Sequence, residues 1–195
     1  MEELYEALKT MGIIKQGHYK LTTGKHSNIY FQKDELWHRD VNLRNLIIDK
    51  LYSLSRIDNY INCEIVTGPA TAGSMWALSI ALELQTPFVY CEKKDDKMVY
   101  GRGFDKIIEN KKILIVEDII TTGKSVKKTI QAIIENKGTI SGIVCIWNRK
   151  RTIFDYPVFS LINKIVYEFD SDDCPQCNNK EPLHDPKTGK VIEGE

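Results

Sequence analysis

The sequence predicts an α/β fold with a central parallel sheet, and two observations support this. Short apolar runs of strand length alternate along the chain with longer stretches of helical periodicity. Residues 113–116 are apolar at every position, which is typical of a strand buried on both faces of a parallel sheet. Because strands separated by helices are joined by crossovers, the alternation favours parallel pairing, with helices flanking the sheet.

The helices are expected where apolar residues recur at three- and four-residue steps. In the first of them, Leu4 and Leu8 would share one face, and Gly138 would stop the last. The expected helices span residues 2–11, 40–56, 73–84 and 124–136.

The strands are expected between these helices and around a Thr-Gly turn near the N-terminus. Residues 158–161 and 164–169 would add a short strand pair, and the polar tail from Asp170 onward is expected to be loop. The other extended segments are 18–21, 28–32, 63–67, 86–91, 113–116 and 140–147.

The most informative segment is 112–125, KILIVEDIITTGKS. Glu117 and Asp118 follow the apolar run, and the turn 121–125 opens a helix whose first N–H groups would attract an anion. Two carboxylates would repel a bare phosphate. The pattern therefore favours a ligand with hydroxyls and a metal ion as well, such as a ribose 5-phosphate carrying a magnesium-bound pyrophosphate.

A mononucleotide P-loop and an ordinary strand–turn–helix both fit this segment less well. The P-loop would need a glycine where Asp118 stands. The ordinary strand–turn–helix, with an acid favoured by the helix dipole, would account for one carboxylate but not for the pair.

Composition excludes several classes of function. Lys plus Arg and Asp plus Glu both number 27, so no overall charge attracts nucleic acid. No stretch of 18 apolar residues could span a membrane, and the acidic N-terminus is unlike a signal peptide. Five cysteines do not suggest a disulfide framework. A cytoplasmic protein is expected.

Two segments carry a family resemblance. Residues 113–125 resemble the phosphoribosyl-pyrophosphate (PRPP) motif of type I phosphoribosyltransferases, and residues 21–31, LTTGKHSNIYF, resemble the hood region of the orotate branch. With other segments, the resemblance covers most of residues 1–185. It implies a single domain with a hood (about 1–35 plus the late strands), a core (about 40–150) and a polar tail (about 170–195).

The resemblance implies transfer of the phosphoribosyl group from PRPP to orotate, in pyrimidine biosynthesis, with Mg²⁺ carried by PRPP rather than by protein side chains. Glu117 and Asp118 would bind the ribose hydroxyls, and backbone N–H groups of 121–125 would hold the 5-phosphate. The implied PRPP-binding set is Lys93, Lys94, Glu117, Asp118, Ile119, Ile120, Thr121, Thr122, Gly123, Lys124 and Ser125.

The charged segment 92–104 would, on composition alone, be a solvated hairpin. By resemblance it is the catalytic loop, in which Lys93, Lys94 and Lys97 would stabilise the leaving pyrophosphate, with Lys97 as the catalytic cation. Tyr100-Gly101 stands where many members have His-Gly, and Arg102 would supply the hydrogen-bond donor that is lost with the histidine. The loop would reach the partner subunit's active site, which implies a homodimer.

The resemblance also implies contacts to the base. Arg149 would grip the orotate carboxylate, since a guanidinium fork suits a planar carboxylate. Thr121 would face the pyrimidine, and Tyr30 and Phe31 would form an apolar wall over its ring. The turn 67–70 would hold the pyrophosphate through its backbone.

The pair Cys174 and Cys177 could suggest zinc, with His184 downstream. One C-x-x-C supplies only two of the four ligands of a closed site, and no second pair is suitably spaced. Reduced surface thiols are therefore favoured, although two subunits could share a site. His18, His26 and His38 are expected to be isolated structural residues, with His26, inside the hood motif, a candidate exception.

Two further functions stay open. The same fold could serve a purine base, which Arg149 and the hood motif argue against. A non-catalytic PRPP-sensing regulator would need a basic face or a DNA-reading domain, and the sequence shows neither.

Overall fold

The structure, a computed structural model, describes residues 2–56 and 62–192. The chain divides into two units. Both chain ends, Met1–His38 and Ile165–Glu195, build the first, here called the terminal unit. The second, here called the core unit, is Arg39–Lys164. The last three residues of the predicted tail, 193–195, lie outside the described residues.

Within the described part of the core unit, six strands form one sheet in the order β5-β4-β3-β6-β7-β8. Neighbours from β4 to β8 pair in parallel, and only the edge strand β5 is antiparallel. The predicted parallel sheet is therefore confirmed. The strands are β3 (Ile65–Pro69), β4 (Phe88–Lys94), β5 (Lys97–Val99), β6 (Lys112–Ile120), β7 (Thr139–Asn148) and β8 (Val158–Ile162).

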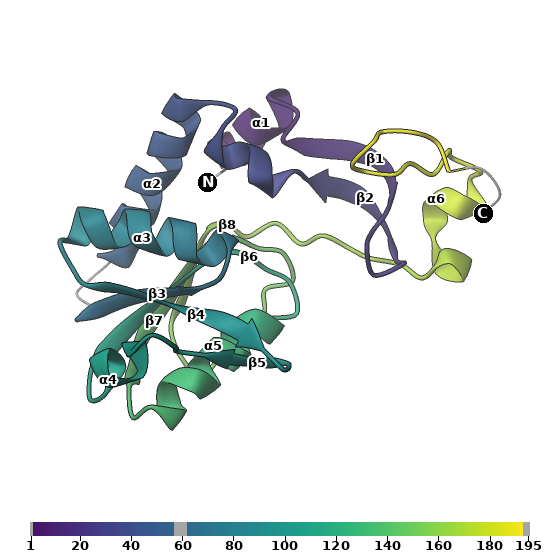
Figure 1. The fold of residues 1–195 in the computed structure, drawn as a ribbon. Helices are drawn as coiled ribbons and strands as arrows, with labels where there is room; N and C mark the ends of the chain where they lie inside the picture. Colours follow the sequence, from purple (N-terminus) through teal and green to yellow (C-terminus); the bar gives the residue numbers. More distant parts are fainter. Residues whose placement is uncertain (1, 57–61, 193–195) are drawn as a thin grey trace. The chain divides into compact units, whose positions relative to one another are not determined.

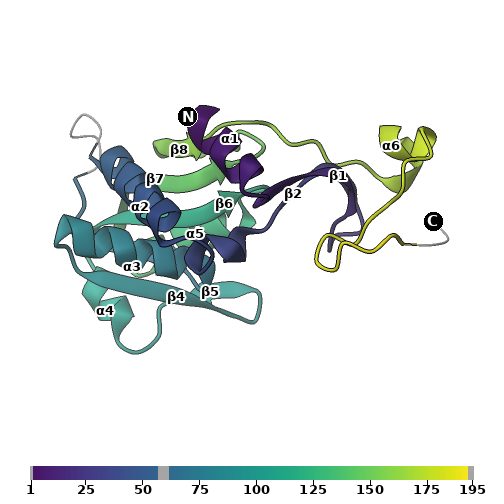
Figure 2. The same ribbon diagram turned by 90° about the horizontal axis from the view of Figure 1, so that it is seen from above.

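Helices cover both faces of this sheet (Figures 1 and 2): α2 and α3 lie on one face, and α4 and α5 on the other. Asp40 caps α2 by accepting the N–H of Leu43 at 3.0 Å. Among the residues described, no helix combines the length and the apolar character needed to cross a membrane. The helices are α2 (Val41–Ser55), α3 (Ala72–Leu84), α4 (Phe104–Ile108) and α5 (Lys124–Glu135).

The central strand β6 matches the predicted buried run, since residues 113–116 are completely buried. Its predicted end at residue 116 is wrong. Parallel pairing with β7 continues through Ile119 opposite Trp147 and Ile120 opposite Asn148. Glu117 and Asp118 therefore belong to the strand itself, because its neighbour satisfies the backbone beyond the apolar run.

The terminal unit contains α1 (Glu2–Thr10) and an antiparallel hairpin of β1 (Ile14–Lys20) and β2 (His26–Phe31). The predicted N-terminal helix and both extended segments are confirmed, with longer strands than expected. Three short helical turns complete this unit: η1 (Lys33–Trp37), η3 (Ser171–Asp173) and α6 (Pro175–Asn178).

One prediction for the C-terminal third is wrong and another is confirmed only in part. The expected pair of 158–161 with 164–169 does not form, because β8 pairs with β7 in the core sheet. The described residues after 170 are mostly loop, as expected, but they include the short turns η3 and α6 and they bond to the hairpin. Phe169 and His26 exchange backbone hydrogen bonds of 2.8 and 2.9 Å, and His184 forms a bridge with Tyr19. The edges of the β1–β2 hairpin thus supply backbone hydrogen-bond partners to the C-terminal segment. Its polar composition gave no sign of these contacts.

Glycine is required where β3 turns into α3. A Cβ at Gly68 would lie 2.4 Å from the backbone oxygen of Gly73 and 2.8 Å from that of Val116. Both obstacles are backbone atoms, so a side chain could be accommodated only by moving α3 or β6.

We expect Gly68→Ala to lower the free energy of unfolding by about 2 kcal/mol, because overpacking at a backbone contact displaces whole elements. Urea denaturation of both proteins measures the difference. The matched control is Gly101→Ala, where a Cβ would meet nothing within 4 Å and which should shift stability by less than about 0.5 kcal/mol. Equal effects of the two substitutions would contradict the packing argument.

Candidate functional site

The acids Glu117 and Asp118 lie at the carboxyl end of β6, where ligands bind in open parallel sheets. Both are buried, at 5% and 4% exposure. Glu117 Oε1 accepts the N–H of Asp118 at 3.1 Å, and Asp118 Oδ1 accepts the N–H of Ile119 at 2.6 Å. Strand N–H groups thus help to hold both carboxylates in place.

The turn from β3 into α3 lies against Glu117. A Cβ at Gly73 would meet Glu117 Oε1 at 2.7 Å, so the glutamate occupies space that only glycine leaves open. The Ala70 N–H donates to the carbonyl of Cys91 at 2.9 Å, which ties the turn to β4, and the Ala70–Thr71 peptide bond is cis. The turn predicted to hold pyrophosphate is therefore next to the acid pair.

The turn before α5 is shaped by Gly123, whose φ of 73° places it in the left-handed region that favours glycine. A Cβ there would also meet Phe154 at 2.8 Å. The first N–H groups of a helix have no partner within the helix and attract anions. A shallow depression beside this helix start is lined by Thr122, Lys124, Lys127, Lys128 and Gln131. Its three lysines add positive charge to the anion site.

The segment after β7 braces this turn. Thr152 Oγ1 donates to the carbonyl of Thr121 at 2.6 Å. Asn148 and Thr152 also bond each other twice, from the Asn148 amide to the Thr152 carbonyl at 3.0 Å and from the Thr152 N–H to Asn148 Oδ1 at 2.9 Å. No pattern in the sequence marked Thr152 or Phe154, because their contacts to the turn depend on the chain path after β7.

Arg149 is brought to the same edge of the sheet. Its N–H donates to the carbonyl of Ile120 at 2.9 Å, and the residue is 8% exposed. The guanidinium lies over the Trp147 ring, 5.4 Å from the centroid, where a cation–π contact favours it. Arg149, Thr121 and the acid pair thus share the region where β6 and β7 end.

The segment expected as a catalytic loop begins as a β-hairpin. Lys94 pairs with Lys97, and Lys93 with Met98, across β4 and β5. All three lysines are exposed. The hairpin predicted from composition and the lysine positions implied by the resemblance are therefore compatible.

Ion pairs hold the hairpin tip against α5. Lys128 Nζ lies 2.5 Å and Lys124 Nζ 3.8 Å from Asp96 Oδ1. The hydrogen bond from Lys128, followed by the charge of Lys124, lowers the pKa of Asp96. Lys124, predicted to bind PRPP, is thus near the tip of the hairpin that carries Lys97.

Tyr100, which takes the place of the histidine that many members carry, lies in the core, whereas Arg102 lies on the surface, and its expected role as a donor stays a prediction. Tyr100 is 3% exposed, and its hydroxyl lies 3.0 Å from Thr67 Oγ1 in the core. Burial raises the pKa of Tyr100 well above its ordinary value. The exposed Arg102 lies 3.6 Å from Glu92. Tyr100 is an aromatic core residue, because strand alternation and the following turn direct it inward.

The predicted apolar wall lies on β2 of the terminal unit. Phe31 is 5% exposed, whereas Tyr30 is half-buried. Neighbours on a strand point to opposite faces, so only one of them can face a given ligand. Burial is the main cause of the raised pKa of Tyr30, followed by the charge of Asp34.

The expectation that His18 and His26 are isolated is wrong, as is the surface location of Cys174, which is 1% exposed. The ligand atoms of His18, His26, Cys174 and Cys177 lie within 4.8 Å of one another in the terminal unit. The hairpin register places the two histidines near each other, and the folded tail brings the cysteines to them. His38 is not a member of this group.

We expect Asp96→Asn to release the hairpin tip, because it removes the charge that both lysines approach. Hydrogen–deuterium exchange of residues 93–99 should become faster at neutral pH. Since the pKa of Asp96 is lowered, the difference should persist at neutral pH and vanish only as the pH falls below the ordinary aspartate range. The control is Asp95→Asn in the same turn, and equal acceleration in both variants would contradict the role of the ion pairs.

Comparison with known proteins identifies a domain family that matches this chain and solved structures that share its fold. The model of the phosphoribosyl transferase domain matches residues 42–172. Among solved structures, an orotate phosphoribosyltransferase from Aeropyrum pernix superposes with a TM-score of 0.66 at 23% identity, over 82% of this chain and 92% of that one. An adenine phosphoribosyltransferase from Saccharomyces cerevisiae gives 0.65 at 17% identity, over 83% and 99%. These structures support the fold, but they do not distinguish an enzyme that acts on orotate from one that acts on adenine.

Curated relatives are more specific. A protein from Thermoanaerobacter sp. (strain X514) is 31% identical over 97% of this chain and 98% of its own length. One from Caldicellulosiruptor saccharolyticus is 32% identical over the same shares. Both are named orotate phosphoribosyltransferase. Together with the domain match and the acid pair at the end of β6, they show that this chain belongs to the orotate phosphoribosyltransferase family.

Proposed function

We propose that the protein transfers the phosphoribosyl group of PRPP to orotate, giving orotidine 5′-monophosphate and pyrophosphate. The observation that carries this proposal is the buried pair Glu117 and Asp118 beside the glycine-capped start of α5. The names of the full-length relatives support orotate as the base.

The ribose phosphate would be held at the end of β6. Carboxylates accept hydrogen bonds, so Glu117 and Asp118 suit the two ribose hydroxyls. The backbone N–H groups of 121–125 suit the 5-phosphate. Ile120 is 1% exposed, so it would contribute to the PRPP site through its backbone, and Ile119 would do the same.

The leaving pyrophosphate would meet the turn 67–70 and the lysines of the β4–β5 hairpin. Breaking the ribose C1–oxygen bond puts negative charge on the pyrophosphate, which positioned cations stabilise. Lys97 is our choice for the catalytic cation, with Lys93 and Lys94 binding the diphosphate. All three are exposed on a hairpin tied down by Asp96, so release of that tip would let them move toward the substrate.

Magnesium would arrive with PRPP. The only side-chain oxygen donors that the described β6 end offers are the Glu117 and Asp118 carboxylates, which suit a hard cation, and Mg²⁺ commonly keeps phosphate and water ligands. A substrate-borne ion next to these acids fits this donor set. Bound there, Mg²⁺ would neutralise charge developing on the pyrophosphate.

Orotate would lie near Arg149 and Thr121. A guanidinium can hold a carboxylate with two parallel hydrogen bonds, which an uncharged group cannot match. The hydrogen bond from Thr152 Oγ1 to the Thr121 carbonyl would hold the Thr121 backbone in place, so that its side chain could face the base and the pyrophosphate. Tyr30 and Phe31 of β2 stay our proposal for the apolar wall over the ring; of the two, Tyr30 is half-buried and Phe31 is buried.

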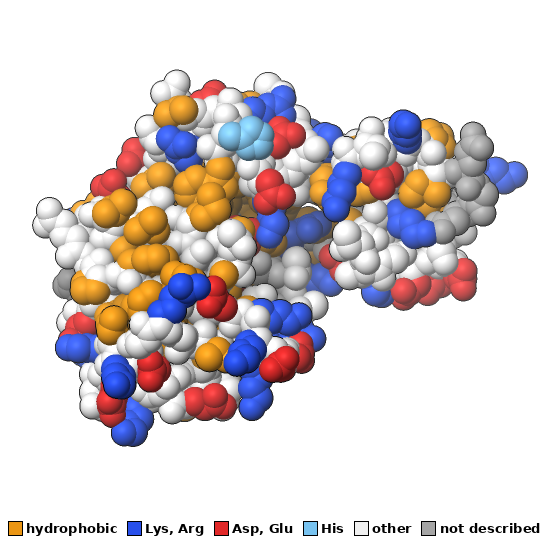
Figure 3. All heavy atoms as spheres, viewed as in Figure 1, with side chains coloured by type: hydrophobic (Ala, Val, Ile, Leu, Met, Phe, Trp, Pro, Cys, Tyr) orange, Lys and Arg blue, Asp and Glu red, His pale blue; other side chains and the backbone are white. Residues whose placement is uncertain are grey.

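We infer a homodimer from an apolar face. Hydrophobic side chains gather over α2 and α3 (Figure 3), and an uncovered patch of this kind commonly marks a protein interface. A second copy is the occupant that would let the hairpin lysines act across the interface. The exposed apolar residues on these helices are Val41, Leu46, Met75, Leu78 and Leu82.

The strongest alternative is a purine-base phosphoribosyltransferase, because an adenine enzyme shares the fold. The full-length orotate relatives argue against it. A PRPP-sensing regulator is disfavoured by the zero net charge.

A panel of bases tests the function directly. With PRPP and Mg²⁺, we expect kcat/KM for orotate to exceed that for adenine or hypoxanthine by about 100-fold or more, because the purines offer no carboxylate to the Arg149 guanidinium. Pyrophosphate release measures turnover. Preference for adenine would establish the purine alternative, and PRPP binding without turnover of any base would indicate a sensor.

We expect Lys97→Ala to lower kcat by about 100-fold while the KM for PRPP changes little, because the cation acts mainly on the departing pyrophosphate. Steady-state kinetics with orotate measures both constants. The control is Lys106→Ala, an exposed lysine on α4 outside the hairpin. Intact turnover in Lys97→Ala would show that the catalytic hairpin is wrongly assigned.

Mixed dimers test whether Lys97 acts in the active site of its own subunit or in that of the partner subunit. If Lys97 serves the partner's site, a dimer of one Lys97→Ala chain and one Asp118→Asn chain has one complete site. Co-expressed chains should then recover about half of the wild-type kcat per mixed dimer. If Lys97 serves its own subunit, every site carries one defect and activity stays at the level of the single variants.

A further inference from the structure

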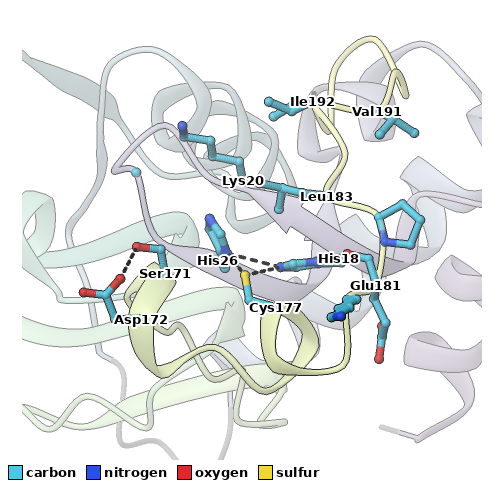
Figure 4. A pocket seen from close by; sticks show the side chains of 13 residues that line it. His18, Lys20, His26, Ser171, Asp172, Cys177, Glu181, Leu183, Val191 and Ile192 are labelled. Carbon is cyan, nitrogen blue, oxygen red and sulfur yellow. Dashed lines mark hydrogen bonds between the residues drawn. The ribbon is translucent and has the colours of Figure 1, made fainter. Parts of the chain in front are cut away.

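Four potential metal ligands meet in the terminal unit. They are His18 on β1, His26 on β2, and Cys174 and Cys177 around α6, with their ligand atoms within 4.8 Å of one another. Figure 4 shows His18, His26 and Cys177 pointing toward one another inside a pocket of about 800 Å³. The four residues come from three chain segments, and the orotate reaction proposed above uses none of them.

The distances between these atoms suit one tetrahedral ion. Ligands about 2.0 to 2.3 Å from a tetrahedral zinc lie roughly 3.3 to 3.8 Å from each other. His18 Nε2 lies 3.1 Å from His26 Nδ1, 3.4 Å from Cys174 Sγ and 3.6 Å from Cys177 Sγ. His26 Nδ1 lies 3.2 Å from Cys177 Sγ. Two of these distances fall in the tetrahedral range, the two that involve His26 are shorter by about 0.1 to 0.2 Å, and all four ligand atoms lie within 4.8 Å of one another, which is close to the spacing of a coordination sphere.

A second contact orients His18 as a ligand. Its Nδ1 lies 3.0 Å from the carbonyl oxygen of Glu181, which can only accept a hydrogen bond. Nδ1 therefore carries the proton in the neutral ring, and the Nε2 lone pair faces the cluster. Metal-bound histidines commonly donate their other N–H to a carbonyl in this way.

Hydrogen bonding alone accounts poorly for the cluster. The single Nε2 lone pair of His18 accepts one hydrogen well, yet three potential donors lie within 3.6 Å of it. Three of the four residues are at most 2% exposed, so water does not readily relieve this crowding. A cation shared by two nitrogens and two sulfurs satisfies all four groups together.

The terminal unit also has a structural need for such an ion. Its sheet has two strands, and a two-stranded hairpin is marginally stable by itself. The ion would join this hairpin to the returning C-terminal segment. Because the free energy of metal binding adds to folding, one ion can stabilise a small unit with a limited apolar core.

We propose that His18, His26, Cys174 and Cys177 form a structural Zn²⁺ site that fastens the C-terminal segment to the N-terminal hairpin. Two thiolates and two imidazoles favour zinc over Mg²⁺ or Ca²⁺, which prefer oxygen. Four protein ligands close the coordination sphere, so the ion holds structure and takes no substrate.

Metal analysis of the untagged full-length protein, purified without chelator, tests the site. Plasma mass spectrometry should find about one zinc per chain, and Cys174→Ser or His26→Asn should reduce this at least about five-fold. The control is Cys63→Ser, a partly exposed cysteine of the core unit, which should keep the zinc. Only trace zinc in the wild type after growth with added zinc, or equal loss in Cys63→Ser, would overturn the proposal.

Cobalt substitution tests the same site without relying on variants that fold poorly. Wild-type protein stripped of zinc and loaded with Co²⁺ should show thiolate-to-cobalt charge transfer and the visible bands of a tetrahedral centre. Chelation should lower the thermal midpoint, and zinc but not magnesium should restore it. A cobalt spectrum without thiolate bands, or a Cys174–Cys177 disulfide in freshly purified protein, would refute the site. These readouts do not depend on turnover of orotate.

Discussion

The close approach of α3 to the carboxyl end of β6 is the constraint on which the candidate site depends. Gly68 and Gly73 remove the two side chains that would separate these elements, and Glu117 fills the space left beside Gly73. A buried carboxylate needs hydrogen bonds to offset lost hydration, and here the strand's own N–H groups supply some of them. Packing and polar satisfaction therefore fix the acid pair together, before any ligand arrives.

The central motif could be predicted from the sequence because its parts are contiguous. The apolar run, the acids and the turn before α5 all fall within residues 112–125, and local rules relate each to a strand or a helix start. The predicted end of β6 is too early, because acids after an apolar run look like a strand's end when the pairing with β7 is unknown. The roles of Thr152 and Tyr100 could not be predicted for the same reason, since one braces a distant turn and the other packs into the core.

The cluster in the terminal unit shows the opposite case. His18 and His26 are near in sequence, but a strand lies on each side of their turn, and only the hairpin register makes them neighbours. Cys174 and Cys177 lie near the other end of the chain. Backbone hydrogen bonds at Phe169 and His184 hold their segment against the hairpin. Spacing rules recognise metal ligands that lie close together along one segment. They find the pair Cys174 and Cys177, but they do not connect this pair with His18 and His26, which lie on two other segments.

The environments of the cysteines show why these two are suited to a metal while others are not. Burial raises the pKa of Cys91 to about 11, and the charge of Glu117 adds to the shift. Burial, followed by the charges of Glu117 and Asp118, raises the pKa of Cys145 further. Burial, with a smaller contribution from the nearby acids, thus keeps these two core thiols protonated and unreactive. Cys174 and Cys177 instead face two imidazoles, one of them oriented by the Glu181 carbonyl. The surroundings of each thiol, rather than the number of cysteines, therefore decide which can serve as a ligand.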